Sequence, residues 1–524
     1  MKETVATQVM AMMTIRTWFR FPLHAFATLG LACSCFIMSI STATATLPSI
    51  LSDGMVLQRS TDVPIWGWEQ PGAEVTVSFR GAEETTIADE TGRWECFLPS
   101  GEAGGPFTMT ITAGETHTLT DLLVGEVWVA GGQSNMWWAL RNTRGGPEAI
   151  ESANDPLLRC FNPQVVWADE ELRTNPNTRW EKATGHRMQD WPGLAYAFAR
   201  VLREELDVPV GIIHVAVAGK QIETFLSPDR VESQFVQLSV AYQEAKAAMP
   251  TRQKAYEEAL AAWEKAGKKG TEPKRPKPPQ QISGLWNGTI APCTPYAARG
   301  FLWWQGEANS NQPRLYESLF PALIVDWRDR FTVPVSAPFY FGELHGAWEM
   351  PNPGMLKASW PRFREAQQTA TRLPGVYAVN ANDLQDPEEK GWPNQIHPWD
   401  KFKAGKRMAQ RALVEVYERE AEAWACPRVV DYRQEEGTFI LEVSQSGAGL
   451  RLSEGEGATG FVIADSNGNW HPAEVELQGD VLRVFSPEVP EPVAVRHAWA
   501  NYPQVNVVNS IGLPLATWRS DSMK

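Results

Sequence analysis

A nearly continuous apolar run at residues 124–130 limits most strongly the folds that this chain can adopt. A strand without polar alternation belongs in a sheet that is covered on both faces, as parallel sheets usually are. Further apolar runs at 210–217, 300–304, 339–344 and 375–380 alternate with helical patterns at 194–206, 315–330, 363–371 and 401–417. This alternation predicts an α/β domain whose parallel sheet is flanked by helices.

The residue pattern on either side of this domain is different. Before residue 122 and after about residue 427, short runs that alternate polar and apolar residues are separated by turns. Strands this short and this closely spaced are typical of β-sandwich modules. We therefore expect an N-terminal β module at 46–122, an α/β domain at 123–425 and a C-terminal β module at 426–524.

Residues 234–280 are expected to be an insertion in the α/β domain. Residues 234–266 are rich in Ala, Glu, Lys and Gln, which predicts one or two exposed helices, and residues 268–279 are basic and proline-rich. This composition favours a solvated decoration over a lid or an interaction arm.

The first 45 residues have the pattern of a secretory signal peptide. Arg16 and Arg20 precede an apolar run at 25–40, and the small residues at 41–45 follow it. Cleavage after Ala45 predicts an exported protein, periplasmic or extracellular, with no membrane span left in the mature chain. Lipoprotein processing at a leader cysteine and an uncleaved leader remain alternatives.

Charge and cysteine spacing exclude several classes of partner. The net charge of −14 argues against nucleic acid, which needs clustered Lys and Arg. Cys96, Cys160, Cys293 and Cys426 are too scattered for a zinc site or a small disulfide framework, although one bridge of undetermined pairing is permitted. No ligand spacing suggests a metal or an organic cofactor.

The most specific chemical signal is the segment Gly131-Gly132-Gln133-Ser134-Asn135-Met136, which directly follows the apolar run. A serine at a tight strand-to-helix turn stands clear of the sheet, beside backbone N–H groups that can hold an oxyanion. Ser134 is thus a candidate nucleophile, and helix capping is the alternative interpretation. A serine nucleophile needs a base, and His397 is the candidate because its loop follows an expected strand and precedes an amphipathic helix.

A third polar loop follows the expected strand at 300–304. Gln305, Glu307 and Asn309 lie in it and could supply hydrogen-bond donors and an orienting carboxylate, although ordinary loop capping would explain them as well.

Short motifs are distributed along nearly the whole chain that follows the expected signal peptide. They are Met55–Gln58, Gly125–Trp128, Gly132–Met136, Trp286–Pro292, Trp304–Glu307, Asp326–Arg328, Arg364–Gln367, His397–Pro398, Ala494–Trp499 and Gly512–Pro514. This set resembles the sialate O-acetylesterase family, a branch of the SGNH (GDSL-like) hydrolases. The resemblance implies a flavodoxin-like hydrolase domain between β modules, and a Ser134–His397 pair that works without a cofactor. It further implies oxyanion donors from Ser134 N–H, Gly219 N–H and the side chain of Gln305.

The sequence departs from the family pattern beside the histidine. The family usually has Asp two residues before it, where this chain has Gln395. A glutamine can orient the imidazole but cannot stabilise imidazolium by charge. Either the pair works without an acid, or Asp383, Asp386 or Asp400 replaces it.

Two further departures concern the substrate pocket. Ala218-Gly219-Lys220 stands where the family has Gly-Gly-Thr, and Glu343 stands where it has Gln. The reaction expected is therefore hydrolysis of an O-acetylated carbohydrate, with sialic acid as the first substrate class. An acetylated polysaccharide such as xylan is the nearer alternative, and a non-catalytic carbohydrate-binding protein is the more distant one.

Overall fold

A parallel sheet forms the centre of the structure, a computed structural model that describes residues 46–346, 359–385 and 396–521. Its strands are β7 (Glu115–Gly132), β8 (Asn154–Phe161), β9 (Trp180–Thr184), β10 (Val210–His214), β11 (Gly300–Trp304), β12 (Phe339–Gly342) and β13 (Val376–Val379). They follow the order β13-β12-β11-β7-β10-β8-β9, and each neighbouring pair is parallel except β8–β9. When β8 and β9 are left out, the remaining strands lie in the order β10-β7-β11-β12-β13. Numbered by their sequence along the chain, they have the order 2-1-3-4-5 of flavodoxin-like sheets, so the predicted fold class is confirmed.

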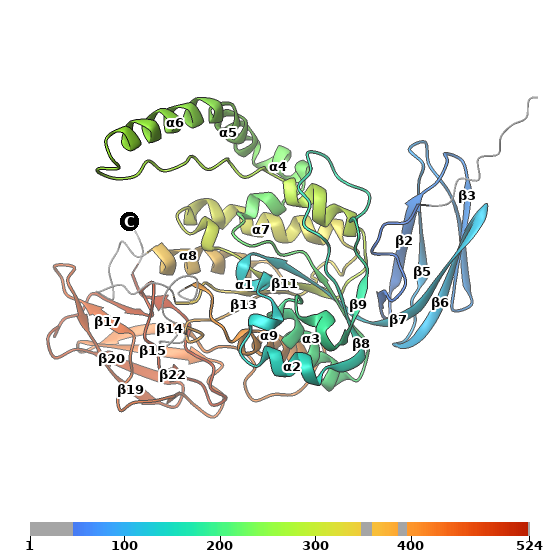
Figure 1. The fold of residues 1–524 in the computed structure, drawn as a ribbon. Helices are drawn as coiled ribbons and strands as arrows, with labels where there is room; N and C mark the ends of the chain where they lie inside the picture. The colour runs from blue at the N-terminus through green and yellow to red at the C-terminus, as the bar shows by residue number, and fades with distance from the viewer. Residues whose placement is uncertain (1–45, 347–358, 386–395, 522–524) are drawn as a thin grey trace, which may run out of the picture. The chain divides into compact units, whose positions relative to one another are not determined.

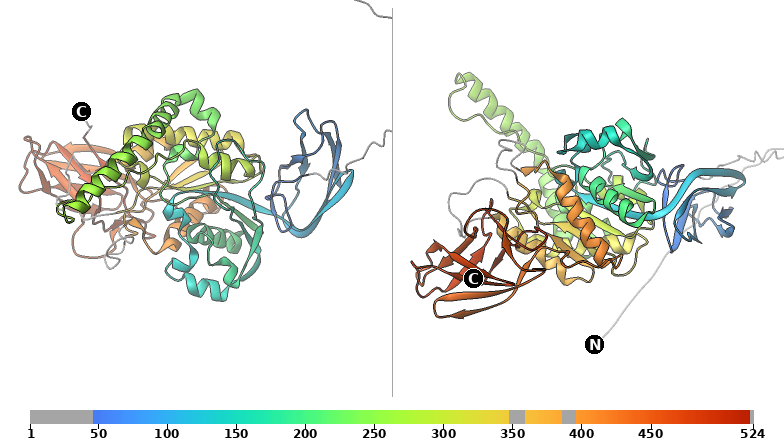
Figure 2. Two further views of the ribbon diagram at one scale, coloured as in Figure 1. Left: turned by 45° about the horizontal axis from the view of Figure 1, so that its top comes forward. Right: turned by 90° about the horizontal axis from the view of Figure 1, so that it is seen from below.

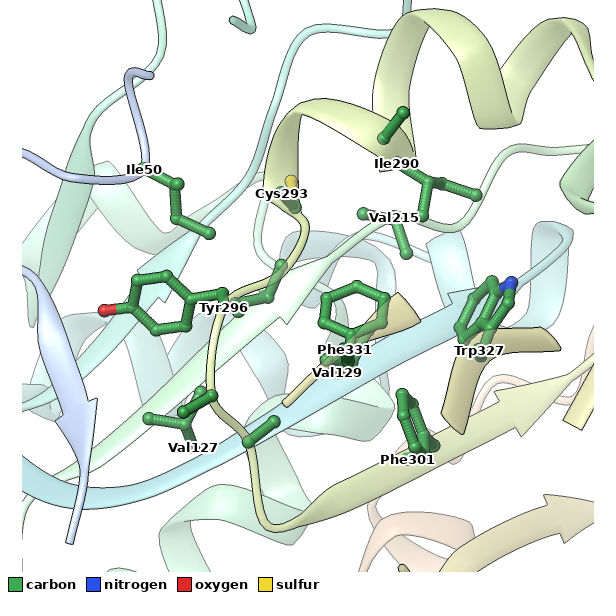
Figure 3. Packing of buried hydrophobic residues seen from close by; sticks show 14 of the residues in the cluster. Ile50, Val127, Val129, Val215, Ile290, Cys293, Tyr296, Phe301, Trp327 and Phe331 are labelled. Atoms are coloured by element: carbon green, nitrogen blue, oxygen red, sulfur yellow. The ribbon is translucent and has the colours of Figure 1, made fainter. Parts of the chain in front are cut away.

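Helices cover both faces of this sheet. Helices α3 (Gly193–Leu206) and α9 (Lys401–Glu415) lie on one face, and α7 (Pro313–Arg330) and α8 (Ser359–Gln368) on the other (Figure 1). Because side chains alternate along a strand, Trp128 of β7 packs in the cluster that contains α3 and α9. Its neighbour Val129 packs in the opposite cluster with Trp327 of α7 (Figure 3). Each strand and helix predicted for this domain is present, with ends that differ by a few residues.

Shorter strands precede β7, and all of them pair antiparallel except the first, which pairs parallel with β7. They are β1 (Val56–Gln58), β2 (Asp62–Trp68), β3 (Glu74–Phe79), β4 (Ala82–Ile87), β5 (Arg93–Pro99) and β6 (Gly104–Ala113). Strand β2 pairs with β5, and β3 pairs with β4 and β6. Strand β6 pairs with the first half of β7, whose second half pairs with β10 and β11. The predicted boundary between residues 122 and 123 therefore falls inside one strand, and the division into domains stays a prediction.

The C-terminal region contains further antiparallel sheets around its own apolar cluster. One has the order β14 (Arg428–Glu435), β15 (Thr438–Ser444), β20 (Val481–Phe485) and β19 (Glu474–Gln478). Another has the order β18 (Trp470–Pro472), β17 (Phe461–Ala464), β21 (Ala494–His497) and β23 (Trp518–Arg519). The short strands β16 (Arg451–Leu452) and β22 (Val507–Val508) form a pair. These sheets agree with the predicted flanking β module.

The expected insertion is helical. After α4 (Pro228–Gln234), helices α5 (Val236–Ala247) and α6 (Met249–Lys265) contain no buried residue, which confirms the prediction of exposed helices (Figure 2). The cysteines of the described residues, Cys96, Cys160, Cys293 and Cys426, are free and buried, so the permitted disulfide does not form among them. None of the helices described is long and apolar enough to span a bilayer.

Candidate active site

The turn after β7 holds Ser134 at the first position of α1 (Ser134–Trp137). Gly132 has φ +127°, and a Cβ there would overlap the carbonyl of Trp304 in β11. The N–H of Gln133 donates to that carbonyl at 2.8 Å. Glycine is therefore required here, because the turn passes directly against the neighbouring strand. The half-buried Ser134 lies at the junction of β7 and β11, where open α/β sheets of this order bind ligands.

The structure brings His397 to Ser134, 263 residues away along the chain. The Nε2 atom of His397 lies 2.8 Å from Ser134 Oγ, and the imidazole is 7% exposed. Trp138 stacks on the imidazole, with ring centroids 5.0 Å apart and an interplanar angle of 25°. This stack restricts the ring orientation, and it is a contact that the sequence reasoning missed.

A chain of buried polar groups lies beside this pair. Asn135 Nδ2 donates to Glu307 Oε1 at 2.5 Å and to the carbonyl of Ile396 at 3.0 Å. Lys401 Nζ donates to Asn135 Oδ1 at 2.5 Å. These bonds join the loops that carry Ser134, Glu307 and His397. Burial raises the pKa of Glu307, although the hydrogen bond from Asn135 and the charge of Lys401 act in the opposite direction.

The position of Lys401 in the sequence could have indicated that this lysine has a specific role. This lysine is the first residue of α9, where the positive end of the helix dipole disfavours a cation. A lysine that is 2% exposed at such a position needs a specific partner, and Asn135 provides it.

Gln305 is fully buried, and both hydrogens of its amide are already used. Gln305 Nε2 donates to the Lys220 carbonyl at 3.1 Å and to Asn309 Oδ1 at 2.7 Å, while its Oε1 accepts from Tyr316 at 2.9 Å. Asn309 in turn donates to Glu223 Oε2 at 3.0 Å. To hold an oxyanion, Gln305 would have to exchange one of these bonds, so this role stays a prediction.

Gly219 follows β10 in an exposed loop with φ +70°. The same segment runs beside the Ser134 turn, because Val217 N–H donates to the Gly132 carbonyl at 2.9 Å. The side chain of Gln280, at the end of the insertion, holds the loop from both sides of Lys220. It donates to the Gly219 carbonyl at 3.2 Å and accepts from the Gln221 N–H at 3.0 Å.

The candidate acids for His397 have other partners or lie outside the described residues. Burial raises the pKa of Asp383, but the charge and hydrogen bonds of Arg407 outweigh it and hold the pKa below its usual value. Both Asp383 oxygens accept from Arg407, at 2.8 and 2.6 Å. Asp400 caps α9 by accepting from the Lys403 N–H at 3.0 Å. Gln395 and Asp386 lie outside the described residues, so the group that supports His397 stays a prediction.

Glu343 follows β12 and is 1% exposed. Its Oε1 lies 3.6 Å from Arg428 Nη2 of β14, and its Oε2 has no hydrogen-bond partner among the described residues. Burial raises its pKa, and the charge of Arg428 opposes this only in part. A carboxyl whose folded-state pKa is raised destabilises the fold as it ionises, so stability falls as pH rises from about 4.5 through the folded pKa.

Glu343→Gln is expected to raise the free energy of unfolding at pH 8 by about 1 kcal/mol, because it removes a buried and poorly compensated charge. Near pH 4 both side chains are neutral, and the two proteins should have equal stability. Urea denaturation at both pH values measures the difference, with the exposed Glu317→Gln as control. A Glu343→Gln protein that is less stable at pH 8 would contradict this account.

Comparisons with known proteins identify the family of this chain. A family model described as carbohydrate esterase, sialic acid-specific acetylesterase, matches residues 124–413. A solved carbohydrate acetylesterase from Xanthomonas citri is 30% identical, with a TM-score of 0.77, over 92% of this chain and 100% of that chain. Sialate O-acetylesterase of Mus musculus is 25% identical over 490 residues, 87% of this chain and 89% of that protein. The Homo sapiens protein of that name is 25% identical over 495 residues, 87% of each.

The matched residues include Ser134, His397 and the strands that carry the loops around them. The chain belongs to the carbohydrate esterase family of sialic acid-specific acetylesterases.

Proposed function

We propose that this protein hydrolyses O-acetyl esters of sialic acids, with Ser134 as nucleophile and His397 as general base. The observation that carries the proposal is the 2.8 Å separation between Ser134 Oγ and His397 Nε2. That separation allows direct transfer of the hydroxyl proton to the imidazole. Family membership supports the choice of an acetyl ester on a carbohydrate.

The reaction has two steps. Ser134 Oγ attacks the acetyl carbonyl carbon while His397 Nε2 takes the hydroxyl proton, and the tetrahedral intermediate collapses as the imidazolium returns that proton to the departing sugar oxygen. A water molecule, deprotonated by His397, then attacks the acetyl-Ser134 ester, and acetate leaves as the serine regains its proton. The N–H groups of Ser134 and Gly219 and the amide of Gln305 are the proposed oxyanion donors.

Gln280→Leu is expected to lower kcat for an aryl acetate about tenfold while KM stays constant, because two hydrogen bonds that hold the Gly219 loop are lost. Gln281→Leu is the matched control, since Gln281 donates instead to the Ala168 carbonyl and to Asp169. If the two variants have equal kcat values, Gln280 does not position the oxyanion loop.

Release of acetate from an O-acetylated sialoside, acetylated xylan and an aryl acetate tests the substrate class, with Ser134→Ala as the blank. Sialoside turnover that exceeds xylan turnover supports the proposal. Turnover of xylan alone would keep the mechanism and replace the substrate, which is the second candidate function. Sugar binding without any turnover would favour the non-catalytic alternative.

We also infer that the chain is exported, since the arginines, the apolar run and the small residues of the first 45 positions have the order of a signal peptide. N-terminal sequencing of the protein recovered outside the cytoplasm should begin at Thr46. Recovery of the intact leader in the cytoplasm would contradict export.

A further inference from the structure

A hollow of about 580 Å³ beside β8 is lined only by polar and charged side chains. This volume lies within the usual range for small-ligand pockets. Its lining includes Asn162, directly after β8, and Asn177, Thr178, Arg179 and Arg187. Hydroxyl and amide groups such as these form hydrogen bonds with sugar hydroxyls.

The hollow lies at the same edge of the sheet as Ser134. Asn162 follows the carboxyl end of β8 and Ser134 follows that of β7, with only β10 between the two strands. Two strand spacings correspond to a lateral separation of roughly 10 Å, which is within the reach of one substrate molecule.

Direct contacts connect the wall of the hollow to the candidate active site. Asp190, which lines the hollow, forms an ion pair with Arg141. Leu140 N–H donates to the Trp191 carbonyl at 2.8 Å. Arg141 follows Trp138, which stacks on His397, by three residues. The segment at 190–191, which contributes Asp190 to the lining of the hollow, is therefore in direct contact with the segment at 138–141, which carries the stacking partner of His397.

The lining carries two arginines and two carboxylates, and the carboxylates have partners other than these arginines. Of its two carboxylates, Asp190 pairs with Arg141, and Glu181 Oε2 accepts from the indole of Trp191 at 3.1 Å. Within the described part of the chain, Arg179 and Arg187 form no ion pair. Two uncommitted guanidinium groups in one polar pocket fit a carboxylate, which arginine binds through paired N–H donors.

We propose that this hollow binds the carboxylate of an acidic saccharide whose acetyl group reacts at Ser134. Arg179 and Arg187 hold the carboxylate, and Asn177, an exposed residue of the same lining, binds a neighbouring hydroxyl. This inference rests on the proposed function, because it names the subsite that selects acidic over neutral acetylated sugars.

The test is an NMR titration of the Ser134→Ala protein with a methyl sialoside and with its carboxyl methyl ester. The Ser134→Ala background prevents hydrolysis of the ester probe by the proposed nucleophile. We expect the acid to bind about tenfold more tightly than the ester, and addition of Arg179→Gln and Arg187→Gln to abolish that preference. Raising the salt concentration should weaken binding of the acid more than binding of the ester.

The matched control adds Arg252→Gln and Arg275→Gln, two exposed positions of the insertion that remove the same charge. Equal affinity for the two probes, or equal loss of preference in the control, would overturn the proposal. Aryl acetate hydrolysis by the wild-type chain reports separately on the Ser134 chemistry. Failure of the subsite is therefore distinguishable from failure of the esterase mechanism.

Discussion

Ser134→Ala and His397→Ala will each lower kcat/KM for an acetyl ester by about 10⁴-fold or more, and the double variant will lose little beyond either single variant. The nucleophile and its base act in one proton transfer, at the 2.8 Å contact, so removal of either group removes the whole step. A 10⁴-fold loss corresponds to about 5.5 kcal/mol of transition-state stabilisation.

Initial rates on an aryl acetate, with thermal melts to show that each variant is folded, measure these losses. Ser152→Ala and His186→Ala are suitable controls, because Ser152 ends α2 (Gly146–Ser152) and His186 is exposed. Losses that multiply in the double variant would mean that Ser134 and His397 act independently. An active His397→Ala protein would require another base.

Local patterns were sufficient to predict the sheet and the tight turn in which Ser134 lies. The apolar run at 124–130 identified β7, and the glycines after it predicted the tight turn that Gly132 makes against Trp304. His397 was predicted from its place after a strand, since loops at the carboxyl ends of parallel strands converge. Each of these inferences used only the order of strands and helices along the chain.

The limits of β7 were harder to predict for a physical reason. Residues 115–121 alternate in exposure as in a sheet with one solvated face, whereas residues 122–132 are buried throughout. The sequence pattern therefore changes within one continuous strand, and this change resembles a domain boundary. Strands β8 and β9 gave no clear signal, because they contain polar residues and pair antiparallel at the sheet edge.

The contacts around His397 could not be predicted from spacing. Asn135 and Glu307 are separated by 172 residues, and Asn135 and Lys401 by 266. Their hydrogen bonds depend on how the loops are packed, and no periodicity in the sequence encodes this. Sequence reasoning identified Glu307 as a candidate carboxylate. It did not identify the amide of Asn135, which donates to Glu307, or the ammonium group of Lys401, which donates to Asn135.

Lys401→Met is expected to lower kcat about 100-fold while KM changes little, because the buried chain that orders the His397 loop loses its first donor. Methionine retains most of the apolar stem, so the variant loses the bond to Asn135 Oδ1, the positive charge beside Glu307 and the cation–π contact with Trp138. Lys403→Met, an exposed position two residues further along α9, should leave kcat unchanged.

The pH dependence separates positioning from a general loss of structure. Burial raises the pKa of Glu307, and the charge of Lys401 opposes that effect, so removing Lys401 raises this pKa further. The destabilisation caused by Lys401→Met should therefore be larger at pH 8, where Glu307 is more ionised, than at pH 5. Adding Glu307→Gln removes the uncompensated charge and should restore part of kcat, giving a non-additive double-mutant cycle. Strictly additive losses that are independent of pH would show that Lys401 acts through packing alone.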